Sequence, residues 1–236
     1  MAMALDEALL EARAAGEVGD VARIFRFVPS AVTIGRFQCA TCEVDIDACA
    51  ARGIDVTRRC TGGGAVFHDS EGEMTFSVVF SASDATRTMA EAFAAVCVPL
   101  AEALSTLGAA VSYQPLNDMV CNMRKISGSA QARRGDAVLI HGTVMHATRT
   151  DLLASLLTVS RTKLDGKGVP SVQKRVTTLE EQGVHATPDT LSAALIRGIE
   201  AAFGPLTPSD IPAVVLKRAD VLVREKYSAT AYVFER

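Results

Sequence analysis

The sequence lacks a long apolar run, an excess of basic residues and a dense set of cysteines. No stretch approaches the roughly 20 apolar residues of a membrane-spanning helix, and the first residues carry acids instead of the basic segment of a secretory signal. The net charge of -3 provides no general basic surface for nucleic acid, although a local cationic pocket is still compatible with it. We therefore expect a cytoplasmic protein that binds neither nucleic acid nor membrane.

Six cysteines, at positions 39, 42, 49, 60, 97 and 121, are too sparse in 236 residues for a disulfide framework. We expect all six to be reduced thiols. The pair in "CATC", Cys39 and Cys42, has the spacing of a redox motif or of half a zinc site. It lacks a βαβ context and a second ligand pair, so we interpret it as a feature of the surface or core.

The chain can form one sizeable core, since 49% of its residues are hydrophobic, and it contains no internal repeat or low-complexity linker. Apolar periodicity predicts helices at 4–16, 45–53, 87–107, 152–157, 179–182, 190–203 and 213–226. Strands are predicted at 22–28, 30–37, 54–59, 65–69, 74–80, 117–121, 126–132 and 137–145, with 65–69 and 74–80 forming a hairpin around "SEGE". Antiparallel strands with peripheral helices predict an α+β protein.

Three consecutive glycines follow a predicted strand in "RRCTGGGAVFHD", residues 58–69. Gly62, Gly63 and Gly64 lack the spacing of a P-loop and of a dinucleotide-binding turn, so neither phosphate motif applies. One interpretation is a simple bend, because glycine triplets commonly break regular structure. The other is a strand edge kept free of side chains so that a ligand can lie against it.

Two arginines and a histidine flank these glycines. Arg58 and Arg59 offer planar donors for a carboxylate or phosphate. Because neighbours on a strand point to opposite faces, we expect one of them to face the pocket and the other the surface. His68 is either a ligand-binding side chain or a hydrogen-bonded structural histidine. Cations beside bare backbone favour a site for an anionic head group with a long apolar tail.

A second constellation lies at residues 117–145. Lys125 is on a short predicted strand ahead of Gly128, Ser129 and Ala130, whose small size leaves room beside the ammonium group. Alone, Lys125 would be interpreted as a solvated strand lysine. Beside a candidate anion site it becomes a candidate electrophile.

Five stretches, in this order, resemble motifs of the lipoate-protein ligases, within the biotin and lipoyl ligase superfamily. They are "RRCTGGGAVFHD", "NDMVCNMRKISGSAQ", "IHGTVM", "TKLDGKGVPSVQKRVTTLEE" and "EKYSATAYVF". The resemblance spans about residues 4–234. Three positions depart from the family pattern: Ile140 replaces a histidine, Thr178 an asparagine and Tyr232 a tryptophan.

The resemblance implies a fold and an activity. The fold is the class II synthetase-like fold of these ligases, a mixed, largely antiparallel β-sheet with helices on one side, formed by one catalytic domain at 1–236. Residues 213–236 are then a closing helix and tail, and the accessory C-terminal domain of many such ligases is expected to be absent. The activity joins lipoate and ATP, with Mg2+, into lipoyl-adenylate and pyrophosphate. A lysine of a carrier protein then takes the lipoyl group and AMP is released.

The resemblance also implies roles for the residues. Lys125 would stabilise negative charge between the acyl carbonyl and the α-phosphate in both steps. The glycines would let an acyl chain, whose methylenes contribute roughly 3 to 6 kcal/mol on burial, lie against the backbone. Asn117 and Asp118 would contact the nucleotide, with Asp118 holding Mg2+, unless they form an ordinary Asx turn. The further contacts expected with substrate or adenylate are Arg58, Arg59, Gly62, Gly63, Gly64, Ala65, His68, Gly128, Ser129, Ala130, His141, Gly142 and Thr143.

The implied partner is a lipoyl carrier domain, from the E2 component of a 2-oxoacid dehydrogenase, a glycine-cleavage H protein or a related carrier. A separate accessory ligase subunit is an open possibility for the adenylation step.

Alternatives to an ATP-dependent ligase stay open. Octanoyl or lipoyl transferases of the superfamily form an acyl-enzyme on a cysteine and use no ATP. In some of them the cysteine lies about a dozen residues before the lysine motif, where residues 109–116 contain none. Cys121 is close in sequence, but a hairpin turn is predicted between it and Lys125. A biotin ligase would have a different glycine-rich signature. A non-catalytic lipoyl-binding module would fit if the three departures marked decay, which the intact glycines and Lys125 argue against.

Overall fold

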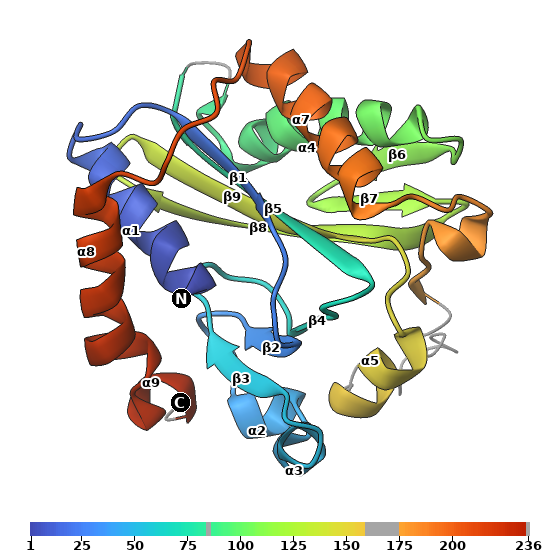
Figure 1. Cartoon of the computed structure of the whole chain (residues 1–236), viewed down its shortest axis with the longest axis horizontal. Helices are drawn as coiled ribbons and strands as arrows, with labels where there is room; N and C mark the ends of the chain where they lie inside the picture. Colours follow the sequence, from blue (N-terminus) through green and yellow to red (C-terminus); the bar gives the residue numbers. More distant parts are fainter. Residues whose placement is uncertain (84–85, 159–174, 235–236) are drawn as a thin grey trace.

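The computed structural model describes residues 1–83, 86–158 and 175–234, so the first part of the motif at 162–181 lies outside the described residues (Figure 1). The helices are α1 (Ala2–Ala14), α2 (Ala40–Glu43), α3 (Ile46–Ala50), α4 (Met89–Ser105), α5 (Thr150–Leu156), η3 (Glu180–Gln182), α7 (Pro188–Phe203), α8 (Ala213–Leu222), η4 (Val223–Tyr227) and α9 (Thr230–Phe234). The strands are β1 (Val21–Phe25), β2 (Ala31–Ile34), β3 (Asp55–Arg58), β4 (Val66–His68), β5 (Glu73–Ser81), β6 (Val111–Gln114), β7 (Asp118–Cys121), β8 (Arg124–Arg134) and β9 (Ala137–Met145).

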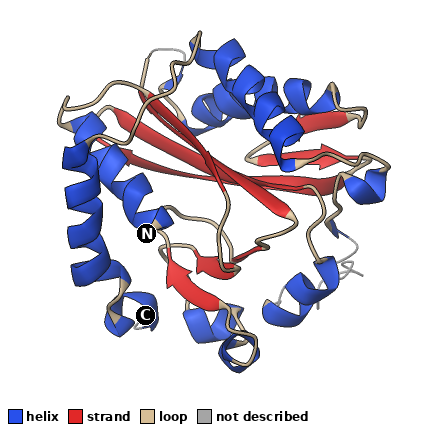
Figure 2. Ribbon diagram, in the orientation of Figure 1, coloured by secondary structure: helices blue, strands red, loops and turns tan. Residues whose placement is uncertain are grey.

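The strands form two sheets (Figure 2). The larger has six strands in the order β1-β5-β9-β8-β7-β6, and every neighbouring pair is antiparallel. The smaller has three strands in the order β3-β2-β4, with β2 parallel to β3 and antiparallel to β4. This mixed, largely antiparallel arrangement with packed helices confirms the predicted α+β class.

Helices cover both faces of the large sheet (Figure 1). On one face, α4 and α7 bury Phe76, Val78 and Ile140. On the other face, α1 packs on Val79 and Leu139, and α8 packs against α1. Val78 and Val79 are neighbours whose side chains point to opposite faces, as do Leu139 and Ile140. The expectation of helices on one side only was therefore wrong, because the central strands β5 and β9 are buried on both faces.

Sequence signals set the starts of the two helices on the first of these faces. Thr88 caps α4 and forms a reciprocal capping box with Glu91. Thr187 caps α7, and Pro188 occupies its first turn. In the described part of the chain, no helix has the length and apolar character needed to cross a membrane.

The predicted hairpin between 65–69 and 74–80 does not form. Strand β4 pairs instead with β2, where Val66 lies opposite Thr33, while both edges of β5 are occupied by β1 and β9. Alternation located both strands but did not give their partners. The strand β6 and the helices α2 and α9 were not predicted, because four or five residues are too few to show a period.

The structure joins Cys39 and Cys42 in a disulfide at the start of α2, so the expectation of six reduced thiols was wrong for this pair. The two-residue spacing at a helix start brings the Cα atoms to 5.2 Å, within the range that a disulfide requires. Cys49, Cys60 and Cys97 are free and buried, as is Cys121.

Candidate functional site

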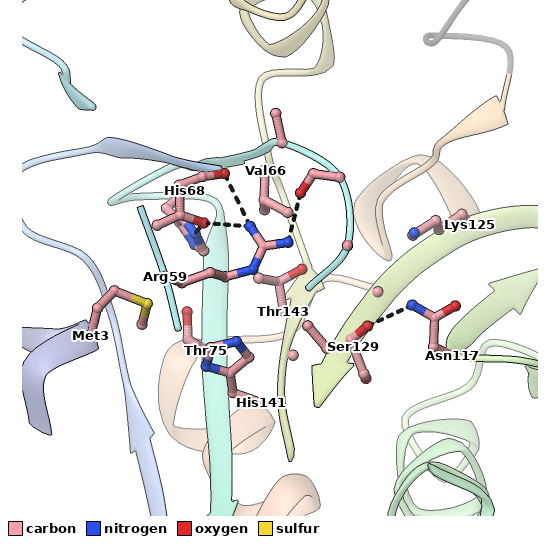
Figure 3. A pocket seen from close by; sticks show the side chains of 17 residues that line it. Met3, Arg59, Val66, His68, Thr75, Asn117, Lys125, Ser129, His141 and Thr143 are labelled. Carbon is pink, nitrogen blue, oxygen red and sulfur yellow. Dashed lines mark hydrogen bonds between the residues drawn. The ribbon is translucent and has the colours of Figure 1, made fainter. Parts of the chain in front are cut away.

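Two adjoining cavities lie where the glycine segment crosses the face of the large sheet. The inner one has a volume of about 110 Å³ and the outer one about 670 Å³. Figure 3 shows the inner cavity with Met3, from α1, at one end and Lys125 at the other. The residues that border both cavities are Gly64, Ala65, Val66, Lys125, Gly128 and Thr143. Lys125 therefore lies at the junction between a narrow chamber and a wide one.

The structure brings together most of the predicted site residues. Those lining the inner cavity are Arg59, Gly63, Gly64, Ala65, His68, Asn117, Lys125, Gly128, Ser129, Ala130, His141, Gly142 and Thr143. Asp118 lines the outer cavity. Arg58 and Gly62 line neither of the two. The motifs that stand far apart in the sequence thus converge on one place, on strands β4, β8 and β9 and the glycine segment.

Lys125 is held by a carboxylate. Its Nζ atom lies 2.6 Å from Oδ1 of Asp118, and the two side chains are 37% and 33% exposed. The β7–β8 hairpin sets this geometry, because Asp118 pairs with Gly128 across the strands. A Cβ atom on Gly128 would come within 2.6 Å of the Lys125 ammonium nitrogen, so a larger residue there would displace the end of the lysine side chain. The prediction that a small residue makes room beside the ammonium is confirmed at Gly128.

Asn117 fixes β7 to β8 instead of forming an Asx turn. Its Nδ2 donates to the Ser129 carbonyl at 2.5 Å, and the Ser129 N–H donates back to the Asn117 carbonyl at 2.8 Å. The neighbouring segment at 175–178 supports the same strand, since the Thr177 N–H donates to the Lys125 carbonyl. Lys125 therefore stands on a strand that is held on both edges.

Arg59 explains the middle one of the three glycines, Gly63. Its guanidinium has five N–H donors, and all of them bond within the protein: Nε to Thr61 Oγ1 (3.0 Å), one terminal nitrogen to the Thr33 carbonyl and hydroxyl (3.1 and 3.2 Å), and the other to the carbonyls of Gly62 and Gly64 (2.8 and 2.7 Å). Gly63 between them has φ 91°, and a Cβ there would lie 2.9 Å from the guanidinium. The glycines thus fold around Arg59, whose burial lowers its pKa to about 10.

Arg58 is equally buried, so neither arginine faces the surface and that expectation was wrong. Arg58 is the last residue of β3 and Arg59 follows it, and the two side chains have different hydrogen-bond partners. Arg58 donates to the carbonyls of Gly35, Arg36 and Gln38 and to those of Tyr232 and Val233, at 2.7–3.1 Å. It thereby joins the segment after β2 to α9.

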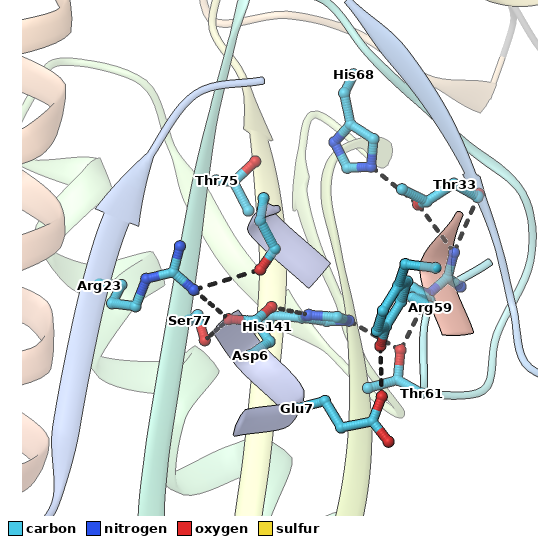
Figure 4. Close-up of polar contacts among 12 residues, drawn as sticks. Asp6, Glu7, Arg23, Thr33, Arg59, Thr61, His68, Thr75, Ser77 and His141 are labelled. Atoms are coloured by element: carbon cyan, nitrogen blue, oxygen red, sulfur yellow. Dashed lines mark hydrogen bonds and ion pairs between the residues drawn. The ribbon is translucent and has the colours of Figure 1, made fainter. Parts of the chain in front are cut away.

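The two predicted histidines are buried and hydrogen-bonded through both ring nitrogens (Figure 4). His68 contacts Thr33 Oγ1 at 2.9 Å and Glu73 Oε1 at 3.0 Å. His141 contacts Thr61 Oγ1 at 2.8 Å and Asp6 Oδ2 at 2.8 Å. Both also line the inner cavity. For His68, then, the structural interpretation is confirmed, while the substrate contact stays a prediction.

The acids and hydroxyls that hold these histidines were missed from the sequence. They are Asp6, Thr33, Thr61 and Glu73, all buried. Only Asp6 left a signal, since it is an acid among apolar residues on α1. Burial alone would raise its carboxyl pKa, but hydrogen bonds from His141 and Ser77 and the charge of Arg23 outweigh that effect, and the pKa lies below its usual value.

None of the six cysteines, all of which are in the described part of the chain, lines either cavity. Cys97 lies behind the wall of the inner cavity, with its Sγ 3.5 Å from Oγ of Ser129, which lines that cavity. Burial raises the pKa of the Cys97 thiol to about 11 and that of Cys60 to about 12, so both are protonated at neutral pH.

The fold is that of the class II synthetase-like ligases, and its two cavities meet at Lys125. The chain belongs to the family of the lipoyl protein ligase A/B catalytic domain, whose model matches residues 1–200. This confirms the resemblance found in the sequence. The family match makes the protein an enzyme of the lipoate ligase and octanoyltransferase group.

Relatives and solved structures agree with this assignment. Octanoyltransferase LipM of Brevibacillus brevis is 27% identical over 266 aligned residues, which cover 100% of this chain and 95% of the relative. The bi-partite lipoate protein ligase of Thermoplasma acidophilum, from a study with its E2 lipoyl domain, superposes with a TM-score of 0.86 at 31% identity, covering 99% and 90% of the two chains. A lipoate-protein ligase A bound with ATP has the same TM-score and identity, covering 98% and 92%.

Proposed function

We propose that this protein is a lipoate-protein ligase. It condenses lipoate with ATP to lipoyl-adenylate and pyrophosphate, then transfers the lipoyl group to a lysine of a carrier domain and releases AMP. One observation carries the proposal: Lys125 lies at the junction of a narrow and a wide cavity, and no thiol lines either of them in the described structure.

The inner cavity takes the acyl chain. It runs from Lys125 toward Met3, between the glycine segment and the face of the large sheet (Figure 3). Ala65, Val66 and Ala130 add apolar wall to the glycine backbone. Each methylene buried there contributes about 0.8 kcal/mol, which favours an acid with a chain over a short one.

The outer cavity takes the nucleotide. Its volume of about 670 Å³ suits an adenylate, and Asp118 and Lys125 stand where the cavity meets the inner one. Mg2+, when bound with ATP, supplies positive charge at the phosphates. It is commonly held by one or two carboxylates plus phosphate oxygens, so the single carboxylate of Asp118 fits this role without a larger ligand cluster. Asp118 would then exchange its ion pair with Lys125 for the metal.

Lys125 serves both steps because both leave negative charge at the junction. In adenylation a lipoate carboxylate oxygen attacks the α-phosphorus and pyrophosphate leaves. In transfer the carrier amine attacks the acyl carbonyl and the bond to AMP breaks. An ammonium about 4 Å from such a charge stabilises it by roughly 4 kcal/mol at an effective dielectric near 20.

A cysteine-dependent octanoyltransferase is the second candidate, favoured by the full-length similarity to octanoyltransferase LipM. That mechanism needs a thiolate within reach of the acyl carbonyl. The Cys97 thiol is hydrogen-bonded to Ser129 behind the wall of the inner cavity, and its pKa of about 11 keeps it protonated. These features support the ligase over the transferase.

The carrier experiment separates the two candidates. A lipoyl carrier domain is incubated with the protein and either lipoate, ATP and Mg2+, or an octanoyl-carrier protein without ATP, and its intact mass is measured. We expect a gain of one lipoyl group in the first mixture only. Acylation without ATP would overturn the ligase proposal in favour of the transferase.

Adenylation by the isolated chain is tested separately, because the archaeal relative is a bi-partite ligase. Exchange of labelled pyrophosphate into ATP, dependent on lipoate, shows that this chain activates lipoate alone. Transfer from preformed lipoyl-adenylate without such exchange shows that a separate accessory subunit completes the activation.

A further inference from the structure

Arg59 lies at the centre of two matching hydrogen-bonded arms that span the space between the two sheets (Figure 4). In one arm, Arg59 Nε donates to Thr61 Oγ1, which contacts His141 Nε2, and His141 Nδ1 contacts Asp6. In the other, a terminal nitrogen of Arg59 donates to Thr33 Oγ1, which contacts His68 Nε2, and His68 Nδ1 contacts Glu73. Each arm therefore consists, in order, of an arginine, a threonine, a histidine and a carboxylate.

The two ends of each arm limit the directions that its hydrogen bonds can take. A guanidinium can only donate and a carboxylate can only accept. The histidine Nδ1–H donates to the carboxylate, and its Nε2 shares a hydrogen bond with the threonine hydroxyl, whose direction depends on the form of the ring. That hydroxyl is then left with a lone pair for the N–H of Arg59. Each threonine hydroxyl therefore accepts from Arg59 and is hydrogen-bonded to the histidine of its arm.

The outer ends of the arms are anchored on the large sheet and on α1. Asp6 Oδ1 also accepts from Arg23 at 2.8 Å and from Ser77 at 2.7 Å. Glu73 Oε1 also accepts from Thr75 at 2.7 Å. The inner end, Arg59, holds the carbonyls of the glycine segment. The arms therefore tie the position of that segment to the opposite wall of the inner cavity.

The arms also explain how a polar wall can face an acyl chain. Five of their members or anchors line the inner cavity: Thr33, Arg59, His68, Thr75 and His141. An apolar chain tolerates polar groups beside it only when those groups are already hydrogen-bonded. Within the arms each N–H, hydroxyl and ring nitrogen has a partner. The buried oxygen that lacks one is Oε2 of Glu73, at the outer end of its arm.

We propose that the hydroxyls of Thr33 and Thr61 are positioning groups for the acyl site, because they transmit the anchoring of Glu73 and Asp6 to Arg59 and so fix the glycine wall. The kinetic part of this proposal rests on the proposed ligase function; the structural part does not. Both threonines act through Arg59 and neither is placed in the chemistry.

The test compares variants that lose the threonine hydroxyl at nearly constant side-chain size with variants that keep a hydroxyl. Thr33→Val and Thr61→Val remove the hydroxyl, whereas Thr33→Ser and Thr61→Ser keep it. We expect each valine variant to raise the KM for lipoate about tenfold, because one buried donor of Arg59 is left without an acceptor beside the chain. The kcat and the KM for ATP should stay within about threefold, and the serine variants should behave as the wild type. A purely structural defect would lower the active fraction without changing KM.

Hydrogen exchange gives a readout that does not depend on activity. Amides in residues 60–66 should exchange faster in the valine variants than in the serine variants, with exchange in α4 and α7 unchanged. If a valine variant does not fold, Asp6→Asn and Glu73→Gln are measured instead, with Glu7→Gln as the control, since Glu7 contacts Lys226 and Tyr227 and not Arg59.

The outcomes separate the two proposals. Equal KM and equal exchange for valine and serine variants would overturn the positioning role. Faster exchange at 60–66 in a protein that acylates no carrier would support the positioning role while the ligase function fails. A wild-type ligase whose valine variants keep their KM and exchange would leave the ligase function standing and end the positioning proposal.

Discussion

Lys125 and Asp118 form an ion pair, 2.6 Å from Nζ to Oδ1, at the junction of the two cavities. The pair keeps the ammonium over Gly128 and toward the site in the absence of an anion. On the proposed function, an adenylate in the outer cavity would bring its own negative charge and compete with Asp118 for the same cation. The ion pair therefore already places the Lys125 ammonium at the junction, so that a small movement would bring it to a phosphate there.

Replacing Lys125 tests this arrangement directly. Lys125→Ala should keep the fold, because the side chain is 37% exposed, and should lower lipoyl transfer from preformed lipoyl-adenylate by about a hundredfold. Carrier mass after timed incubation measures the rate. Lys217→Ala, at an exposed position on α8, is the matched control. Wild-type transfer in the Lys125 variant would remove this residue from the mechanism.

Gly128→Ala should disturb the same cation without removing it. The new Cβ would lie 2.6 Å from Nζ and 2.7 Å from Cε of Lys125, so the flexible side chain must move away. A displacement of about 1 Å at a reacting group can cost on the order of a hundredfold in rate. We expect a large loss of transfer with little loss of stability, measured by carrier mass and by urea unfolding. Unchanged transfer would show that the position of Lys125 is not critical.

The glycine triplet should respond unevenly to alanine. Gly63→Ala places a side chain at φ 91° and 2.9 Å from the Arg59 guanidinium, and we expect it to lower the free energy of unfolding by about 1 to 3 kcal/mol. Gly62→Ala meets no atom within 4 Å, so its effect should stay within about 0.5 kcal/mol. Urea denaturation of both variants measures the difference. Equal stabilities would mean that the loop does not depend on the contact with Arg59.

Thiol reagents should leave the activity intact. After reduction at neutral pH, Cys39 and Cys42 should react with iodoacetamide, whereas the four buried cysteines should not. Burial raises the pKa of Cys97 to about 11, so its thiolate is scarce. Mass mapping gives the modified positions and carrier acylation gives the activity. Loss of transfer in step with modification of Cys97 would favour an acyl-enzyme.

Stability should fall in mild acid through His146. Burial lowers the pKa of this imidazole below its usual value of about 6.5. Below that pH the unfolded chain binds a proton that the folded chain does not, so the free energy of unfolding decreases as the pH falls from 7 to 5.5. His146→Gln should flatten this dependence, by up to about 1 kcal/mol over that range. His185→Gln, at a side chain that is 78% exposed, should not. Equal pH profiles for the wild type and His146→Gln would contradict the assignment.

Local sequence patterns predicted much of the secondary structure. The apolar run at 137–145 predicted β9, and residues 87–107 predicted α4 close to its observed limits. The pairing of the strands was harder to predict, because alternation of apolar and polar residues indicates a strand but not which strand lies beside it. The strand at 66–68 therefore looked like the partner of the next strand, and only the occupied edges of β5 show why it turns to β2.

The residues of the candidate site were likewise predicted only in part. Lys125 and Gly128 were predicted together because they are three residues apart on one strand. The partners of Arg59 were not, since Thr33 lies 26 residues earlier and its role depends on a contact between strands. The glycines were expected to make way for a ligand. The arginine that precedes them occupies the space around Gly63, and no spacing rule in the sequence distinguishes these two causes.

Arg58 links residues 232 and 233 to the wall of the outer cavity, which is the proposed nucleotide site. Its guanidinium holds the Gln38 carbonyl, and Gln38 borders the outer cavity, while two other bonds reach the carbonyls of Tyr232 and Val233. Removing those last residues, or fusing a purification tag or reporter to them, would alter the support of a wall more than 190 positions earlier in the chain. With Met3 bordering the inner cavity, internal surface loops are safer points of attachment than either terminus.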